Sequence, residues 1–264
     1  MKNEIKFALY AIKKNIQSSA ELRTSFLLNI FGMMINNISF VVIWVFLIQT
    51  AGDIGGWTTA DVFGLQGFVA LVFGLIFSIG AGLREMPRLV ASGIFDQYLL
   101  SPKNLLGRIA TSSFSASAVG DMFFGIICIC IYLVMIHAGI TQILMCLALV
   151  VFAIIAFVGV TITIQSISFY FTDPDSVTKS VFELFFTPSL FHGGAFQGTM
   201  RFVFTFLIPS LIIGTLPVEA VSHFSYIKLA LVGVLSILWL ILSLQLFKKA
   251  VKRYESANFM TFGA

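Results

Sequence analysis

The sequence predicts an all-α protein, a polytopic membrane bundle of six transmembrane helices preceded by an amphipathic helix. Of its 264 residues, 58% are hydrophobic and only 11% are charged, whereas a soluble domain carries about 25% charged residues. Long uncharged stretches recur along the chain, and the basic residues gather in a few segments between them. So little charge cannot cover a globular surface, which argues against a soluble enzyme, a nucleic-acid-binding domain or a disordered chain.

Residues 1–24 are predicted to form a helix that lies along the cytoplasmic membrane surface. Its apolar residues recur at helical spacing, with lysines on the rest of the turn, and are Ile5, Leu9, Ile12 and Ile16. A basic amphipathic helix of this kind rests in the interface rather than crossing the bilayer. We therefore separate this segment from a transmembrane domain over residues 25–264. Its role is open between a packing anchor and a coupling element.

Five membrane spans follow directly from the distribution of apolar residues. A hydrocarbon core of about 30 Å needs about 20 apolar residues in a helix. The stretches that satisfy this length are 25–50, 62–83, 109–136, 143–171 and 229–247. They contain a single charge, Asp121. Transmembrane strands would instead appear as short alternating segments, so these spans are predicted to be helices.

The basic residues predict the orientation of the bundle and require a sixth span. Thirteen of the sixteen lysines and arginines lie in residues 2–23, 84–108 and 248–253, and the loops 51–61 and 137–142 contain none. The positive-inside rule puts the basic segments in the cytoplasm. Both termini then lie on the cytoplasmic side of the inner membrane, and an even number of spans is needed.

Two positions remain open for this additional span. Residues 202–216 are apolar, but 15 residues at 1.5 Å each cover only about 22 Å, and Pro209 interrupts them. Residues 176–191 are the alternative, followed by a segment 200–216 that enters the outer leaflet and returns. That alternative puts Arg201 on the outer side and Glu183 at membrane depth.

Three stretches of the chain resemble the ABC-2 family of ABC transporter permeases. Residues 93–102, GIFDQYLLSP, are similar to the family's segment between the second and third spans. The spacing of prolines and arginine over residues 188–217, and the tail RYESA at 253–257, are similar to the pattern of one subgroup. The three stretches occur in the family's order and spacing, and the resemblance extends over essentially the whole chain.

The resemblance also favours one position for the fifth span. It indicates a span over residues 176–191 and an outer re-entrant segment over 200–216. The chain departs from the subgroup at Thr187, where tyrosine is usual, and at Thr199 and Met200, where tryptophan is usual.

The resemblance implies the permease subunit of an exporter for a lipophilic or amphipathic substrate. Such a permease pairs in the membrane lipids with a second copy or a related permease. A separate ATP-binding subunit, which holds ATP and Mg, docks on the loop 84–108. The residues implied in this coupling are Gly93, Phe95, Asp96, Tyr98, Leu99 and Pro102. Ile94, Phe95, Tyr98 and Leu99 recur as one apolar helical face. By periodicity alone, this face suits either a partner groove or packing of the loop back onto its own bundle.

Four polar residues within the expected spans are candidates for a translocation path or for structural hydrogen bonds. They are Asn36, Asp121, Gln165 and Glu183. A carboxylate at bilayer depth is costly and usually faces the bundle interior, whereas polar groups between helices more often bond to each other. An alternative function is therefore an ion-coupled secondary transporter or channel that uses Asp121.

The motifs that the chain lacks limit its chemistry. There is no phosphate-binding G-x-x-x-x-G-K-[ST] loop, no H-E-x-x-H and no G-x-S-x-G, and the three histidines are scattered. We therefore expect a protein that is not an enzyme and that binds no metal, cofactor or nucleic acid itself. A membrane scaffold or lipid-modifying enzyme would need a convergent polar cluster, which is not evident. Glycines within the second span, Gly64, Gly67, Gly74, Gly80 and Gly82, predict close contacts between helices.

Overall fold

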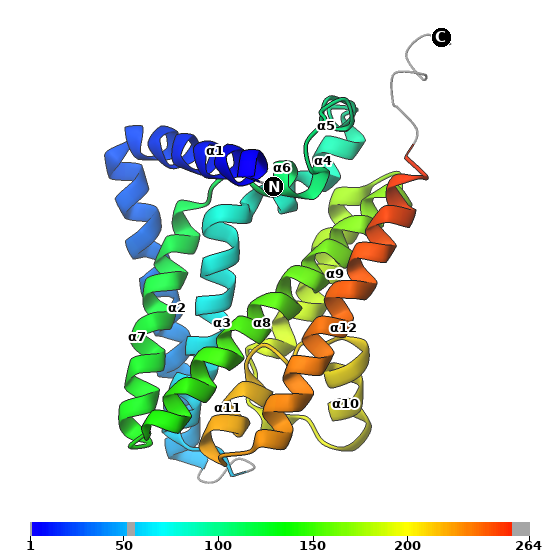
Figure 1. Ribbon diagram of the computed structural model, residues 1–264. Helices are drawn as coiled ribbons and strands as arrows, with labels where there is room; N and C mark the ends of the chain where they lie inside the picture. The colour runs from blue at the N-terminus through cyan, green and yellow to red at the C-terminus, as the bar shows by residue number, and fades with distance from the viewer. Residues whose placement is uncertain (1, 52–55, 255–264) are drawn as a thin grey trace.

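The computed structural model describes residues 2–51 and 56–254, and these form helices without any strand (Figure 1). The long helices are α2 (Arg23–Ala51), α3 (Thr59–Gly80), α7 (Ala116–Met135), α8 (Ile140–Ser166) and α12 (Tyr226–Val251). Helix α1 (Lys2–Glu21) precedes them and is as long as α7. The shorter helices are α4 (Met86–Ala91), α5 (Phe95–Leu99), α6 (Leu105–Ala110), α9 (Pro174–Ser189), α10 (Gly198–Phe202) and α11 (Thr215–Ser222). Three 3₁₀ turns, Ala81–Glu85, Ile167–Phe169 and Gly193–Ala195, and a π-helical turn, Val203–Leu207, complete the described elements.

The five long helices correspond to the five spans that the sequence predicts. Each is long and apolar enough to cross a membrane. The largest difference is at the third span, which begins at residue 116 rather than 109. The predicted helix is interrupted within residues 109–115. Helix α6 ends at Ala110, and the Ser115 hydroxyl caps α7 by accepting a hydrogen bond from the Ala118 amide. Serines at such positions satisfy helix-end amides and so begin a new helix.

The bundle has two distinct ends (Figure 1). At one end, here called the basic end, lie α1, α4, α5, α6 and the last turn of α12. At the other, the far end, lie α10, α11 and the connection between α7 and α8. Helix α8 ends at the basic end, whereas α12 begins at the far end (Figure 1). The chain between these two helices must therefore return to the far end.

Helix α9 begins that return, over almost the residues predicted for the fifth span. The Asp173 side chain caps it, and Pro188 lies in its last turn. Its 16 residues make it shorter than the five long helices. A shorter apolar helical stretch, Gly198–Leu207, follows before α11. The sixth crossing and the re-entrant segment at 200–216 therefore stay predictions.

Helix α1 lies across the basic end instead of along the bundle (Figure 1). The Asn15 side chain donates a hydrogen bond to the Thr111 carbonyl at 2.9 Å, and the Lys103 ammonium lies 3.4 Å from the centre of the Phe7 ring. Ile5 and Leu9 remain exposed. The orientation suits a helix at the membrane surface, and that location stays a prediction.

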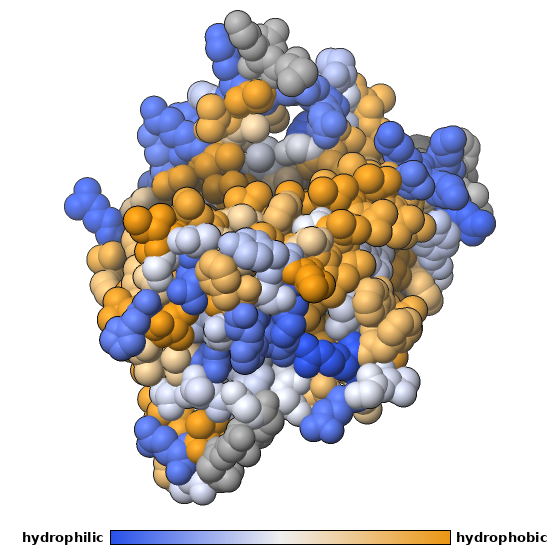
Figure 2. All heavy atoms as spheres, turned by 60° about the horizontal axis from the view of Figure 1, so that its bottom comes forward, coloured by the Kyte–Doolittle hydropathy of each residue, from blue (hydrophilic) through white to orange (hydrophobic). Residues whose placement is uncertain are grey.

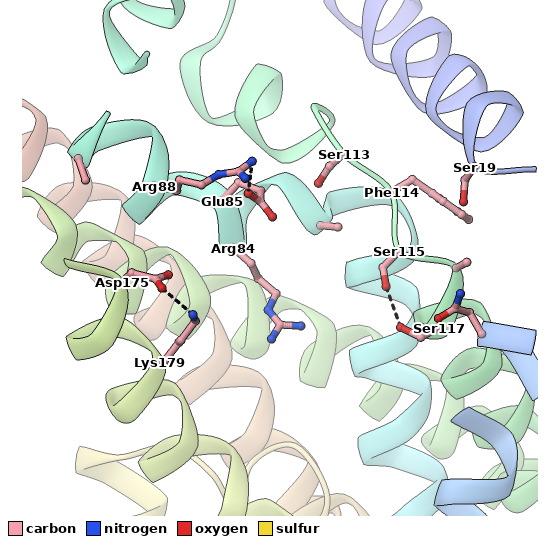
Figure 3. A pocket seen from close by; sticks show the side chains of 14 residues that line it. Ser19, Arg84, Glu85, Arg88, Ser113, Phe114, Ser115, Ser117, Asp175 and Lys179 are labelled. Carbon is pink, nitrogen blue, oxygen red and sulfur yellow. Dashed lines mark hydrogen bonds and ion pairs between the residues drawn. The ribbon is translucent and has the colours of Figure 1, made fainter. Parts of the chain in front are cut away.

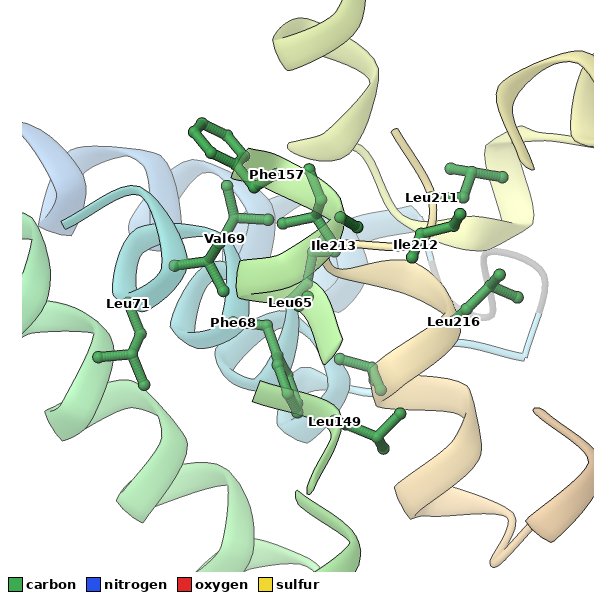
Figure 4. Packing of buried hydrophobic residues seen from close by; sticks show 14 of the residues in the cluster. Leu65, Phe68, Val69, Leu71, Leu149, Phe157, Leu211, Ile212, Ile213 and Leu216 are labelled. Carbon is green, nitrogen blue, oxygen red and sulfur yellow. The ribbon is translucent and has the colours of Figure 1, made fainter. Parts of the chain in front are cut away.

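The main hydrophobic core surrounds α3, which is the most buried of the long helices. Phe68 of α3 and both Leu149 and Phe157 of α8 are completely buried there (Figure 4). Helices α2 and α12, in contrast, expose most of their apolar side chains. These exposed faces are available to lipid or to another membrane protein.

Glycines let α3 and α7 approach closely, as the sequence predicts. A Cβ atom added to Gly67 would lie 2.8 Å from Ile129 Cγ1. Cβ atoms at Gly74 of α3 and Gly125 of α7 would overlap the backbone of the opposite helix. Gly64 and Gly82 also face close neighbours, but Gly80 has open space around it. The prediction is thus correct for four of its five glycines.

Replacing Gly74 by valine should destabilise the bundle, because the side chain would force α3 and α7 apart. Overpacking of this kind costs about 1–3 kcal/mol or more. Thermal unfolding in mild detergent measures the effect, with Gly80→Ala as the matched control. Equal melting temperatures for the two variants would show that the glycine contact does not hold these helices.

Candidate functional site

The connection between α3 and α7 forms a compact platform at the basic end. Gly93, with a φ of +71°, ends α4 and turns the chain into α5. Few residues other than glycine adopt that backbone conformation. Pro102 follows α5, and the Asn104 side chain caps α6 by accepting from the Gly107 amide at 2.9 Å. Gly93 and Pro102 thus bound the short helix that the sequence predicts between them.

Phe95 attaches this platform to the bundle. Its ring is fully buried, with its centre 5.1 Å from that of Phe169 and 4.9 Å from that of Tyr254. Phe169 directly follows α8, and Tyr254 follows α12. Burial, together with the nearby Asp96 carboxylate, raises the pKa of Tyr254 to about 12. Phe95 therefore points inward and fixes α5 against the ends of two long helices.

The apolar face predicted for α5 is consequently divided. Tyr98 is half-buried beneath the Arg108 guanidinium, which also donates a hydrogen bond to the Gln97 carbonyl at 2.9 Å. Ile94 and Leu99 are each 44% exposed, and Leu100 is 86% exposed. The free apolar surface is therefore formed by Ile94, Leu99 and Leu100. The sequence analysis did not single out Leu100, although the Leu-Leu pair before Ser101 was a visible signal.

A small, mainly apolar pocket that contains a few polar side chains lies between α2, α3, α7 and α9, with a volume of about 150 Å³. Asp121, in the second turn of α7, is almost completely buried in its wall. Its Oδ1 accepts a hydrogen bond from Asn37 Nδ2 at 2.6 Å. Its Oδ2 has no hydrogen-bond partner among the described residues. Asn36 and Gln66 line the same pocket.

The other two polar candidates lie apart from this pocket. Gln165 is buried near the end of α8, and its Oε1 has no partner in the described part of the chain. Glu183 is exposed on α9. The structure therefore brings together Asn36 and Asp121 but adds neither Gln165 nor Glu183 to them. A single path lined by all four does not form.

An ion-pair cluster lies at the far end, where Figure 2 shows polar side chains gathered between apolar surfaces. The nearly buried Glu219 of α11 contacts Arg201 at 2.6 Å and Lys228 at 2.7 Å. Beside it, the Ser222 hydroxyl donates to Asp61 Oδ1 at 2.5 Å. These residues line a cavity of about 360 Å³. The sequence analysis assigned no role to Glu219 or Lys228, although two isolated charges in so apolar a region were a signal.

Glu219 should make the stability of the far end depend on pH. Burial alone would raise its pKa, but Arg201 and Lys228 outweigh burial and lower it. Ionised Glu219 therefore stabilises the fold above its unfolded-state pKa of about 4.3, and this contribution disappears as pH falls through the lower, folded-state pKa. Glu219→Gln should lower the free energy of unfolding at pH 7 by about 1–2 kcal/mol, since both cations are partly solvated.

Thermal unfolding between pH 3 and 7 measures this contribution. The wild-type protein should lose its advantage over Glu219→Gln only at the acidic end of that range. Asp175→Asn, which removes an exposed pair with Lys179, serves as the control and should change stability little. A constant difference between wild type and Glu219→Gln down to pH 3 would contradict the assignment.

Metal-binding geometry is not found in the described ranges, where no group of three or more His, Cys, Asp or Glu side chains could hold an ion. A family model described as "ABC-2 family transporter protein" matches residues 10–258. The match covers all five long helices, the platform and the far-end cluster. Neither a curated protein nor a solved structure matches the chain significantly.

Proposed function

Because the chain belongs to the ABC-2 family of transporter proteins, we propose that it is the transmembrane permease subunit of an exporter driven by a separate ATP-binding subunit. The family match makes the chain a membrane transport component rather than a catalyst. The observation that carries the finer proposal is α5, a short helix that presents Leu99 and Leu100 outward and is anchored from within by Phe95.

The proposed topology has the basic end in the cytoplasm and the far end outside. Support comes from the thirteen basic residues in the segments at the basic end and from α1 lying across it. Helix α9 forms the fifth crossing, and residues 200–216 form the outer re-entrant segment. Both termini are then on the cytoplasmic side of the inner membrane.

The ATP-binding subunit, which carries ATP and Mg, docks on the platform of residues 84–108. A groove on that subunit receives the exposed leucines of α5, as an apolar helix face fits a hydrophobic groove. The contacts of Phe95 with Phe169 and Tyr254 pass a displacement of α5 to the ends of α8 and α12. Gly93 and Pro102 set the position of α5 without touching the groove.

The permease works as a dimer with a second copy or a related permease, surrounded by lipids. Helix α2 supports this proposal because it packs on α7 along one side and exposes large apolar residues on the other. These include Phe31, Ile35 and Val42. The substrate is lipophilic or amphipathic and moves outward.

One observation favours a second candidate, an ion-coupled transporter. The Oδ2 atom of Asp121 lacks a hydrogen-bond partner within the described residues, and Asp121 lines a pocket together with Asn36 and Gln66. A carboxylate of this kind marks ion pathways in some membrane proteins. The two candidates make opposite predictions for this residue.

Removing the exposed leucines of α5 should detach the ATP-binding subunit. Purification of the Leu99→Ala, Leu100→Ala double variant from the native host should recover at least about tenfold less of that subunit than wild type, which corresponds to about 1.4 kcal/mol. Quantitative mass spectrometry of the co-purifying chains measures the loss. Leu22→Ala, at an exposed leucine of the basic end outside the platform, is the matched control.

The Phe95→Ala variant, purified in the same way, distinguishes loss of the inner anchor of α5 from loss of the docking leucines. Some ATP-binding subunit should remain bound, because the outward leucines are still present, but the platform should be less stable. Wild-type protein that purifies without any ATP-binding chain would refute the proposal. So would a double variant that retains as much of that chain as Leu22→Ala.

Liposomes that contain the Asp121→Asn variant should be as impermeable to protons as liposomes that contain wild type, because the exporter does not use an ion gradient. Liposomes that contain the permease and an internal pH-sensitive dye measure this property under an imposed gradient. Asp121→Ala should cost about 1 kcal/mol of stability through the lost bond from Asn37, as for other hydrogen bonds between membrane helices. Proton flux in wild type that Asp121→Asn abolishes would favour the ion-coupled alternative.

A further inference from the structure

A large open cavity lies at the basic end, between the end of α3, the start of α7 and the start of α9 (Figure 3). Its volume is about 770 Å³, which is within the range of about 300–1,000 Å³ typical of small-molecule sites. Serine side chains line one wall, and charged side chains line the other. The charged residues of the lining are Arg84, Glu85, Arg88, Asp175 and Lys179.

The charged side chains of this lining carry one more positive charge than negative charges. Arg88 pairs with Glu85 at 2.7 Å, and Lys179 pairs with Asp175 at 2.5 Å. Arg84 points into the cavity (Figure 3). Over residues 2–51 and 56–254, no ion pair or hydrogen bond engages its guanidinium. The cavity therefore carries a surplus positive charge.

The start of α7 strengthens the positive field on the opposite wall. This helix has 20 residues, and the Ser115 hydroxyl at its N-cap lies 3.0 Å from the Ser117 hydroxyl. The N-terminal end of a helix behaves as about half a positive charge. Ser113 adds a further hydroxyl to the lining. Arg84 and these serine hydroxyls thus place donors for an acidic group on opposite walls of the cavity.

An aromatic surface leads from Arg84 into the bundle. The guanidinium carbon lies 5.1 Å from the centre of the Phe77 ring and 5.6 Å from that of Phe182. Phe182 stacks on Phe186 with ring centres 5.6 Å apart, and Phe186 lines the pocket of Asp121. Arginine stacks on aromatic faces and still binds a carboxylate or phosphate through its planar fork. Arg84 thus lies beside an aromatic cluster in which Phe77 is buried and the rings of Phe182 and Phe186 are half-buried.

We propose that this cavity binds the acidic head of an amphipathic anion, a carboxylate or phosphate attached to a hydrocarbon or aromatic body. Arg84 holds the acid, and the half-buried rings of Phe182 and Phe186 beside it receive the apolar body. The inference rests on the proposed function, for which the cavity is the cytoplasmic uptake site of the cargo. It deepens that function by naming the charge of the cargo.

Photo-crosslinking of the full permease in phosphatidylcholine nanodiscs tests the proposal. One probe is a fatty acid with a diazirine in its chain, and the other is the methyl ester of the same acid. Peptides that contain Phe182 and Phe186 should be labelled at least tenfold more by the acid than by the ester. Labelling of the lipid-exposed α12 provides the internal reference, because both probes partition into the bilayer.

Variants at Arg84 connect the labelling to the guanidinium. Arg84→Gln should reduce labelling by the acid at least tenfold, and Arg84→Lys should retain an intermediate level. Arg23→Gln, at the basic end but outside the cavity lining, should match wild type. Unchanged melting temperatures for the Arg84 variants establish that they are folded. Equal labelling by acid and ester, or full labelling of Arg84→Gln, would overturn the proposal.

A second arm distinguishes the source of the acid. Nanodiscs that contain a diazirine-bearing phosphatidic acid should label the same peptides if the anion is a membrane lipid, whereas labelling by the fatty acid alone indicates a free amphiphile. Absence of labelling in both arms would overturn the proposal, as expected if a second permease covers Arg84. The readout needs no ATP, so its result is independent of whether the ATP-binding subunit is found.

Discussion

The contact of Phe95 with Phe169 and Tyr254 joins the platform at the basic end to the membrane bundle. Helix α5 has only five residues, and so short a helix does not persist in isolation. Complete burial of a phenylalanine stabilises its position by about 1.5–3 kcal/mol. The exposed Leu99 and Leu100 are therefore held at a fixed place, next to an aromatic cluster that contacts the ends of α8 and α12.

The two ends of the bundle treat charge differently. At the far end, Glu219 forms ion pairs with Arg201 and Lys228. These pairs connect α11 to α10 and to the start of α12. At the basic end, the large cavity retains Arg84 as a surplus cation. A surplus cation in an open cavity attracts an incoming anion. This asymmetry suits uptake at the basic end and release at the far end.

Much of the fold was predictable because long uncharged stretches in a charge-poor chain have few alternatives to membrane helices. The glycines of α3 were also informative, since small residues permit close helix contact. The inward position of Phe95 was not predictable, because helical periodicity identifies a face but not its partner. The Glu219 cluster required tertiary proximity, since Arg201 lies 18 residues before it in a separate helix. The hydrogen bond between Asn37 and Asp121 likewise joins helices distant in sequence.

Site-specific photo-crosslinking in the native host tests the central claim most directly. A photoreactive amino acid at Leu100 should form a covalent product with an ATP-binding subunit, and the same amino acid at the lipid-exposed Ile227 should not. Mass spectrometry identifies the crosslinked chain. A product at Leu100 that contains an ATP-binding subunit is the predicted result. Crosslinking at Leu100 to lipid alone would contradict the claim that α5 is where that subunit docks.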